Sequence, residues 1–249
     1  MVGSPIAHSL SPAMHRAAYG ELGLDWTYDA IEVSSGALAS FVDRLDSDWA
    51  GLSVTSPLKR EAAACAATRS PLVDDLGVAN TLIGGIDGWH AVNTDVAGAV
   101  NALRECGIDQ LDSVRFLGGG ATVESLRLAV RELGASHIEV FVRDPSKVVD
   151  ESVDVRPLEE PPAETVDLLV STIPVAAVPH DAAATARAVF DVVYDPWPTP
   201  LASAAADQGR RVVTGVDLLA HQAALQVELM TGESVEPGLL REAALATLA

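Results

Sequence analysis

Short apolar runs alternate with helical stretches through the second half of the chain. The first run covers 114–117 and is followed by three glycines and a helical stretch from about 123 to 133, which ends at Gly134. Near-continuous apolar strands separated by helices are typical of a parallel sheet covered on both faces. We therefore predict an α/β domain here. Its other predicted elements are strands at 138–142, 166–172, 189–194 and 211–214 and a helix at 201–208.

The first half of the chain alternates too, but tighter turns separate its elements. The segments 80–83 and 89–92 flank Asp87-Gly88, which is a strong hairpin signal. A helix is predicted from Thr94-Asp95 to Arg104, and it connects the two halves. The other predicted elements are helices at 12–22 and 36–45, strands at 27–33 and 51–55, and helices from Asp217 onward with a break near Gly232 and Pro237.

The composition is that of a globular protein large enough for two small domains. The chain has 249 residues, of which 49% are hydrophobic and 20% charged. No apolar run reaches the roughly 18 residues that span a bilayer, and no basic stretch followed by an apolar one marks a secretory signal. We therefore expect a cytoplasmic protein without a membrane partner. Cys65 and Cys106 lack metal-like neighbours and are expected to stay reduced on helices.

The formal net charge of −19 changes the picture of possible partners. It argues against nucleic acid and anionic membranes, because both repel a strongly acidic protein. If the ligands are anions, the few cations must gather where they bind. A Lys or Arg near a glycine-rich turn therefore has more weight here than in a basic protein.

The run Gly118-Gly119-Gly120, followed by Ala121, lies between a predicted strand and a predicted helix. Free backbone N–H groups and the helix dipole attract phosphate at such a helix start, and glycines let the backbone come close. The motif is imperfect, because Val123 occupies the third glycine place of G-x-G-x-x-G. The glycines alone also fit a plain tight turn. The strand-helix context favours a Rossmann-type site for a nicotinamide dinucleotide.

The residues after the next predicted strand bear on the choice of cofactor. An NAD site usually places Asp or Glu near this point, to accept hydrogen bonds from the ribose 2′-hydroxyl. Arg143 instead suggests a 2′-phosphate, with Lys147 as a second cation. Asp144 leaves two alternatives open, because it could turn toward a ribose or pair with Arg143 on the surface. We favour NADP over NAD.

Four segments of the first half combine small polar residues with tight turns at strand ends or helix starts. Hydroxyls, amides, one Lys and one Asp are what a polyhydroxylated carboxylic acid would need. Ligands of open α/β sheets bind at the carboxyl ends of strands, where these segments are predicted to lie. The segments are 3–12, 53–59, 79–81 and 93–95.

An ordered set of motifs along nearly the full length closely resembles the shikimate dehydrogenase family. The motifs are Ser-Pro-Ile-Ala-His-Ser-Leu-Ser-Pro at 4–12, Val-Thr-x-Pro-x-Lys at 54–59, Ala-Asn-Thr at 79–81, Asn-Thr-Asp at 93–95, the glycine loop, Asp-Val-Val-Tyr-Asp-Pro-Trp-Pro-Thr-Pro at 191–200, Gly215, and Leu-Leu-Ala-His-Gln-Ala-Ala at 218–224. The resemblance implies reversible reduction of 3-dehydroshikimate to shikimate with NADPH. It also implies a substrate domain, 1–96 with 217–249, that faces an NADP-binding domain, 97–216, across a cleft.

The resemblance also implies roles for single residues. Lys59 and Asp95 would be the catalytic pair, in which a Lys ammonium can polarise a ketone and supply a proton. Which of the two is the formal acid or base stays open, and no metal is needed. Substrate contacts are implied for Ser9, Ser11, Thr55, Asn80, Tyr194 and Gln222. Cofactor contacts are expected at Gly118, Gly119, Gly120, Ala121, Arg143, Lys147 and Gly215.

Plainer alternatives exist for both members of the pair. Without the resemblance, Asp95 could be only a helix N-cap, and Lys59 could be an ordinary exposed lysine. His8 and His15 are expected to be structural hydrogen-bonding residues. An NAD-dependent quinate/shikimate dehydrogenase and a relative that binds shikimate without turnover are the rival functions. A monomer and a homodimer both stay open.

The chain departs from the family pattern at several positions. Ser53 stands where Asn is common, Leu58 where His is common, and Leu218 where Met is common beside the nicotinamide. The usual Asn-Arg-Thr cofactor signature is Val142-Arg143-Asp144 here. The chain also begins almost at the Gly-x-Pro-Ile segment, so we expect a shortened first strand, and an upstream start of the natural chain stays open.

Overall fold

The structure is a computed structural model that describes residues 1–148, 150, 152–160, 162 and 164–248. The chain divides into two compact units, Met1–Gly98 with Leu219–Ala249, and Ala99–Leu218. The boundaries lie two residues from those expected from the sequence, inside helices α5 (Asp95–Glu105) and α8 (Gly215–Thr231). The predicted α/β class is confirmed.

The second unit is built on a six-stranded sheet with the order β12-β11-β10-β7-β8-β9, in which every neighbouring pair is parallel. This is the doubly wound order of a Rossmann fold, and its topological switch point lies between β7 and β10, where ligands of such sheets bind. The strands are β7 (Ser113–Leu117), β8 (His137–Val142), β9 (Asp154–Pro157), β10 (Val166–Ser171), β11 (Ala186–Asp191) and β12 (Arg211–Thr214).

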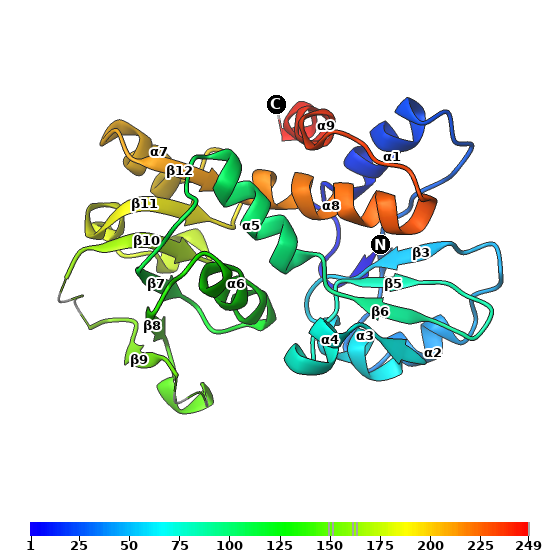
Figure 1. The fold of residues 1–249 in the computed structure, drawn as a ribbon, viewed down its shortest axis with the longest axis horizontal. Helices are drawn as coiled ribbons and strands as arrows, with labels where there is room; N and C mark the ends of the chain where they lie inside the picture. Colours follow the sequence, from blue (N-terminus) through cyan, green and yellow to red (C-terminus); the bar gives the residue numbers. More distant parts are fainter. Residues whose placement is uncertain (149, 151, 161, 163, 249) are drawn as a thin grey trace. The chain divides into compact units, whose positions relative to one another are not determined.

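Some connections between the strands of this sheet contain short 3₁₀ helices in place of α-helices. Helix α6 (Ala121–Glu132) follows β7 and lies against the sheet, and α7 (Pro200–Asp207) precedes β12 (Figure 1). Within its described residues, the β8–β9 connection contains only the 3₁₀ helix η1 (Pro145–Lys147). Between β10 and β11 lie the 3₁₀ helices η2 (Val175–Ala177) and η3 (Ala182–Thr185).

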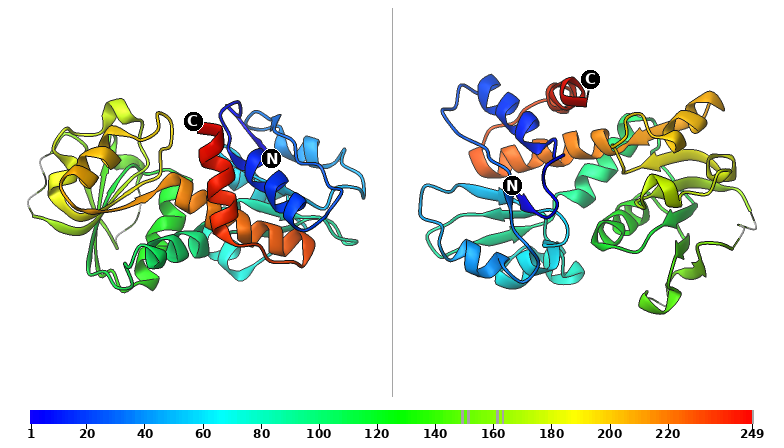
Figure 2. Two further views of the ribbon diagram at one scale, coloured as in Figure 1. Left: turned by 90° about the horizontal axis from the view of Figure 1, so that it is seen from above. Right: turned by 180° about the vertical axis from the view of Figure 1, so that it is seen from behind.

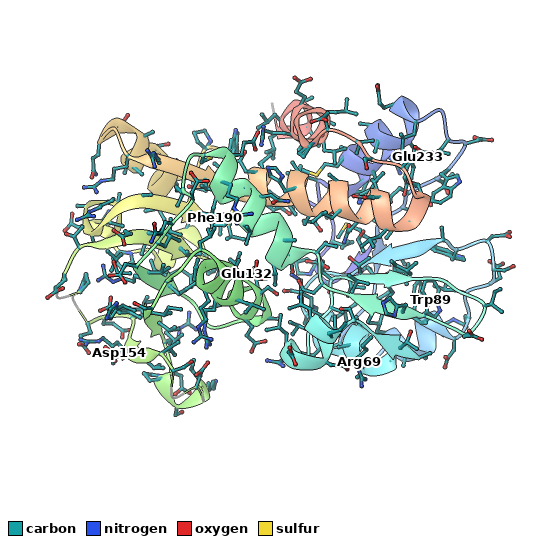
Figure 3. The ribbon with its side chains drawn as sticks, viewed as in Figure 1. Arg69, Trp89, Glu132, Asp154, Phe190 and Glu233 are labelled. Carbon is teal, nitrogen blue, oxygen red and sulfur yellow. The ribbon has the colours of Figure 1, made fainter. Side chains whose placement is uncertain are left out.

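Alternating side chains of these strands form the core of the second unit. Leu117, Phe141 and Leu169 point into one apolar cluster with residues of α7 and η3. Phe190 of β11 is fully buried among the strands (Figure 3). Successive strand residues face opposite sides of a sheet, so both faces of this sheet are apolar.

The first unit has a mixed sheet in which β3-β5-β6-β4 are neighbours and β1 pairs with β2 in parallel. A parallel bridge between Val2 and Val54 joins the two groups. The predicted hairpin is confirmed, because β5 and β6 are antiparallel. The strands are β1 (Val2–Gly3), β2 (Ile31–Glu32), β3 (Gly51–Ser53), β4 (Thr68–Arg69), β5 (Thr81–Ile83) and β6 (His90–Val92).

Helices cover both faces of this sheet. Figures 1 and 2 show α2, α3 and α4 on one face, and α8 and α1 on the other, with α9 beside α1. Trp89, just before β6, packs against the apolar core cluster of the first unit (Figure 3). The helices are α1 (Ser11–Glu21), α2 (Leu38–Val42), α3 (Lys59–Cys65), α4 (Pro71–Leu76) and α9 (Pro237–Leu248).

Several predicted elements are displaced or shortened. The strand predicted at 27–33 is only β2, because its partner β1 is two residues long. The strand predicted at 189–194 is β11, Ala186–Asp191, which leaves the sheet where the Asp191 carboxylate accepts hydrogen bonds from the Thr199 hydroxyl and from the Val193 N–H. The helix predicted at 36–45 is the shorter α2.

The sequence analysis missed α3, β4, α4 and β9. The edge strand β9 has polar residues and no apolar run, which hides it from a hydrophobic pattern. Helix α4 has local signals in the sequence: Ser70 caps it, Pro71 begins it, and Gly77 ends it with φ of 66°. No helix in the described part of the chain has the length and apolar character to cross a bilayer. Cys65 and Cys106 do not form a disulfide.

Candidate active site

Lys59 and Asp95 form a buried ion pair in the first unit. Lys59 is the first residue of α3 and Asp95 the first of α5. The Lys59 Nζ lies 2.6 Å from the Asp95 Oδ2, and the two side chains are only 8% and 7% exposed. The interpretation of Lys59 as an ordinary exposed lysine is therefore wrong. Taking two charges out of water is unfavourable unless they are paired and hydrogen-bonded, so the pair requires further polar partners.

Asn93, and not Asp95, caps helix α5. The Asn93 Oδ1 accepts hydrogen bonds from the backbone N–H of Asp95 at 3.0 Å and of Val96 at 3.3 Å. The Asn93 amide is anchored in turn by a bond to the Val78 carbonyl oxygen at 3.1 Å. The Asp95 carboxylate is thus available to Lys59, and the alternative that Asp95 is only an N-cap is wrong.

Asn80, just before β5, links this pair to its surroundings. Its Nδ2 lies 2.9 Å from the Asp95 Oδ1, 2.8 Å from the Thr94 Oγ1 and 3.1 Å from the Gln222 Oε1. Its Oδ1 accepts from the Thr94 backbone N–H at 2.8 Å and from the Thr81 hydroxyl at 3.0 Å. Because a backbone N–H can only donate, the amide of Asn80 has one orientation, with its NH₂ group toward Asp95.

Gln222 reaches this cluster because helices α5 and α8 approach each other closely. A Cβ at Gly98, one turn after Asp95, would lie 2.9 Å from the backbone nitrogen and Cβ of Gln222. Only glycine permits that approach. The structure thus brings Lys59, Asp95, Asn80 and Gln222 together, as the sequence-based expectation required.

The candidate carboxylate-binding residues lie in the same unit. Ser11 is the buried first residue of α1, and the half-buried Ser9 accepts a hydrogen bond from the Ser11 N–H at 3.3 Å. The Thr55 N–H donates to the Val2 carbonyl oxygen at 3.0 Å, which places Thr55 beside Gly3. The Ser9 hydroxyl also donates to the Met1 sulfur, and the Ser11 hydroxyl shares a hydrogen bond with Tyr28, so both serines are tied to neighbouring residues of the first unit.

Three further polar residues of the first unit were missed by the sequence analysis. Tyr28, Thr81 and Gln226 are buried and hydrogen-bonded to segments of the candidate site. Gln226 follows Gln222 by four positions, so both lie on one face of α8, and this spacing is a signal that could have found it. Buried His15, expected to be structural, stacks on the Tyr28 ring, and burial lowers the pKa of His15 to about 3.

The glycine run forms the loop between β7 and α6 in the second unit. Gly118 has φ of 117°, and a Cβ there would lie 2.3 Å from the Thr172 Oγ1, so glycine is required. Gly119 stands next to Val142, and Gly120 precedes Ala121, the first residue of α6. A Cβ at Gly120 would meet nothing within 4 Å, which leaves open space at a helix N-terminus without a side-chain cap. Such a cradle fits a pyrophosphate.

The third glycine place of the motif has a structural explanation. Val123 is 1% exposed and belongs to the buried face of α6, so the helix packs through a side chain where the fingerprint usually has glycine. The first turn still starts at Gly120, whose carbonyl oxygen accepts from the Val123 N–H at 2.9 Å. The missing glycine therefore leaves the glycine loop at the start of α6 intact.

The segment after β8 shows which groups the Asp144 carboxylate contacts. The Asp144 carboxylate accepts hydrogen bonds from the Ser146 hydroxyl at 2.6 Å and the Ser146 N–H at 3.2 Å, and it lies 3.6 Å from the Lys147 Nζ. The Ser146 hydroxyl bond is the largest cause that lowers the pKa of Asp144. Arg143 is exposed and makes no hydrogen bond or ion pair with any described residue, so the proposed Arg143–Asp144 pair is not formed.

Two predicted site residues lie elsewhere in the second unit. Tyr194 follows β11 and is half-buried, and burial raises the pKa of its phenol. Gly215 begins α8 next to the Val192 carbonyl. Among the described residues, no group of three or more His, Cys, Asp or Glu side chains is placed to hold a metal ion.

Comparison with known proteins identifies the family to which the chain belongs. Residues 1–82 match the family model described as the shikimate dehydrogenase substrate binding domain. The chain is 32% identical over 255 residues to the shikimate dehydrogenase (NADP(+)) of one strain of Thermus thermophilus, covering 98% of this chain and 96% of the relative. The chain belongs to the shikimate dehydrogenase family. Hundreds of curated proteins, 402 in all, show significant similarity to it.

Solved structures of shikimate dehydrogenases share the fold over the full length. The Mycobacterium tuberculosis shikimate dehydrogenase superimposes with a TM-score of 0.87 at 35% identity, covering 98% of this chain and 97% of the other. The shikimate 5-dehydrogenase of a second Thermus thermophilus strain, solved in complex with NADP(H) and shikimate, has a TM-score of 0.87 at 32% identity and covers 99% and 98%. The expected family resemblance is therefore confirmed.

Proposed function

We propose that this chain catalyses the reversible reduction of 3-dehydroshikimate to shikimate, with Lys59 and Asp95 as its catalytic pair. The chain is an NADP(H)-dependent oxidoreductase of the shikimate pathway, a shikimate dehydrogenase. The observation on which the assignment of the pair rests is the 2.6 Å contact between the buried Lys59 ammonium and the Asp95 carboxylate, with Asn80 on the second carboxylate oxygen.

The chemistry of the pair follows from its surroundings. NADP(H), when bound, would supply or accept the hydride. Lys59 would polarise the substrate oxygen and give it a proton, which a ketone needs as it becomes an alcohol. Asp95 orients the ammonium, and its buried charge is held by the Asn80 amide. Since the donors are fixed before substrate arrives, little reorganisation is needed during the reaction.

Substrate recognition is assigned to polar side chains around this pair. Ser9 and Ser11 would hold the carboxylate through their hydroxyls, as the family resemblance implies. Thr55, Asn80 and Gln222 would contact the ring hydroxyls or the carboxylate, and Tyr194 is also proposed as a substrate contact. Two observations support this assignment: Asn80 and Gln222 lie within hydrogen-bond distance of each other, and Asn80 also contacts the catalytic carboxylate.

NADP(H) is assigned to the second unit. The loop Gly118, Gly119, Gly120 and Ala121 would bind the pyrophosphate at the start of α6, and Gly215 would border the nicotinamide end. Arg143 and Lys147 would bind the 2′-phosphate. The engagement of Asp144 with Ser146 supports this choice, because the Asp144 Oδ1 already accepts two hydrogen bonds within its own loop.

The test is an absorbance assay of nicotinamide reduction that crosses shikimate and quinate with NADP⁺ and NAD⁺. We expect turnover with shikimate and NADP⁺, and its absence with every pair would remove the enzyme function. A preference for quinate or NAD⁺ would favour the rival dehydrogenase. Lys59→Ala is expected to abolish turnover with an unchanged circular dichroism spectrum, and near-normal shikimate oxidation by this variant would refute the proposed pair.

A cytoplasmic location and a monomeric or homodimeric state complete the proposal. The small-molecule partner is shikimate, and no nucleic acid partner is proposed for a chain with a net charge of −19. Size-exclusion chromatography with light scattering would separate a monomer from a homodimer. A larger assembly would contradict this part.

A further inference from the structure

Gln226 lies at the centre of a buried polar cluster that the proposed mechanism does not use. It is 1% exposed, and its side-chain amide forms four hydrogen bonds. The Nε2 donates to the Asn80 carbonyl oxygen at 3.1 Å and to the Thr81 Oγ1 at 2.8 Å. The Oε1 lies 2.7 Å from the Ser53 Oγ and 3.2 Å from the His15 Nε2. A primary amide has no capacity left after four such bonds.

The directions of these bonds are determined by chemistry. The Asn80 carbonyl can only accept, so the Nε2 of Gln226 must face it and the Oε1 must face Ser53 and His15. Ser53 and His15 therefore donate. Because Ser53 has a single hydrogen, the Tyr28 hydroxyl must donate to the Ser53 oxygen, at 2.6 Å. His15 is then protonated on Nε2, and its buried Nδ1 has no hydrogen-bond partner among the described residues.

The other side of Gln226 leads to the catalytic carboxylate. The Thr81 hydroxyl accepts from Gln226 and donates to the Asn80 Oδ1 at 3.0 Å. The Asn80 Nδ2 donates to the Asp95 Oδ1 at 2.9 Å, and the Lys59 ammonium donates to the second oxygen of that carboxylate. The donors from Tyr28 to Asp95 thus all point the same way.

We infer that Gln226 is a positioning residue for the catalytic pair. It contacts none of the atoms proposed to touch substrate, but it holds Asn80 twice, through the backbone carbonyl and through Thr81. It also fastens α8 to the start of β5, one helical turn from Gln222. This inference rests on the proposed function of Lys59 and Asp95.

Ser53, the last residue of β3, is one of the hydrogen-bond partners of Gln226. Its hydroxyl donates to the Gln226 Oε1 at 2.7 Å. The amide of Gln226, buried on α8, therefore supplies the hydrogen-bonding centre between β3 and β5. The position of Asn80 consequently depends on a residue more than 140 positions away in the sequence.

The experiment compares Thr81→Val, which removes only the hydroxyl link, with Thr81→Ser, which keeps it. We expect Thr81→Val to lower kcat/KM for shikimate about tenfold, equivalent to about 1.4 kcal/mol, and Thr81→Ser to stay within about twofold of wild type. The KM for NADP⁺ should stay constant, because the proposed cofactor site lies in the other unit. Thr231→Val, the same change at the C-terminal end of α8, is the matched control and should leave kcat/KM unaltered.

Gln226→Met, which keeps the side-chain volume, tests the centre directly. We expect a loss at least as large as that of Thr81→Val, and we expect the loss in the double variant to be smaller than the sum of the two single losses, because both variants break the Gln226–Thr81 bond. If Gln226→Met does not fold, the Thr81 pair of variants decides the matter alone.

The inference is overturned by unchanged kcat/KM in Thr81→Val, by failure of Thr81→Ser to preserve activity, or by strictly additive losses in the double variant. A parallel rise in the KM of NADP⁺ would also overturn it, because that indicates general damage to the fold. Failure of the proposed function is a separate result, since it would appear as an inactive wild-type enzyme with shikimate and NADP⁺.

Discussion

Gly98 offers a sharp test of how helix packing sets the geometry of the active site. Gly98→Ala would place a Cβ 2.9 Å from the backbone nitrogen and Cβ of Gln222 and 3.0 Å from its Cα. Ordinary contacts between such atoms lie at about 3.5–4.0 Å. The backbone of α8 at Gln222 must therefore retreat from α5 by about 0.6–1 Å, because neither partner atom belongs to a flexible side-chain end.

The retreat is large enough to break one hydrogen bond of the site. The Asn80 Nδ2 and the Gln222 Oε1 are 3.1 Å apart. A shift of this size along the line between them would lengthen their distance beyond about 3.6 Å, where no hydrogen bond remains. A net hydrogen bond contributes about 0.5–1.5 kcal/mol. We therefore expect kcat/KM for shikimate to fall roughly twofold to tenfold, mainly through KM. The KM for NADP⁺ should not change.

Stability gives an independent readout with a matched control. Alanine favours a helix over glycine by about 1 kcal/mol, but overpacking costs about 1–3 kcal/mol, so Gly98→Ala should be neutral or destabilised in urea denaturation. Gly20→Ala, in α1, meets nothing within 4 Å and should be stabilised without a kinetic effect. Equal stabilisation of both variants with unchanged shikimate kinetics would refute the argument.

Two further expectations concern the cofactor and pH. Arg143→Ala should raise the KM for NADP⁺ about tenfold or more and leave the KM for NAD⁺ unchanged, because one charge-assisted contact to the 2′-phosphate is lost. Equal effects on both cofactors would contradict this role. His15 has a folded-state pKa of about 3 and an ordinary value of 6.5, so only the unfolded state binds its proton between these values. As the pH decreases below about 6.5, the free energy of unfolding should therefore decrease by up to about 1.4 kcal/mol per pH unit. Urea denaturation of His15→Gln should show a shallower pH slope, and identical slopes would exclude His15 as the cause.

The sequence predicted the second unit well around its glycine loop, because the signals there are local. The strand before Gly118, the glycine turn and α6 follow one another within a short segment, and each has its own pattern. The boundary of β11 was wrong by three residues, because Val192, Val193 and Tyr194 continue an apolar run that the structure takes out of the sheet. The turn of the chain there depends on the Asp191–Thr199 contact, which no local pattern reveals.

In the candidate site, the resemblance predicted which residues meet, but not which residue caps α5 or which residues contact Gln226. Resemblance pointed to Lys59, Asp95, Asn80 and Gln222, and the structure brings them together. The helix cap of α5 could not be chosen from Asn93-Thr94-Asp95, because all three residue types can cap. The choice depends on the Val78 carbonyl that anchors Asn93. The partners of Gln226 come from α1, β3 and β5, so their meeting is a tertiary effect that periodicity does not encode.

The short segment after β8 has a consequence for how cofactor preference can change. Arg143, Ser146 and Lys147 are exposed, and the loop is organised by the single carboxylate of Asp144. Replacing these residues exposes no core and breaks no strand pairing, so mutations here are nearly free of a folding penalty. If this segment holds the 2′-phosphate as proposed, exchanging its residues would change the preference between the two nicotinamide cofactors and leave the buried Lys59–Asp95 pair unaltered.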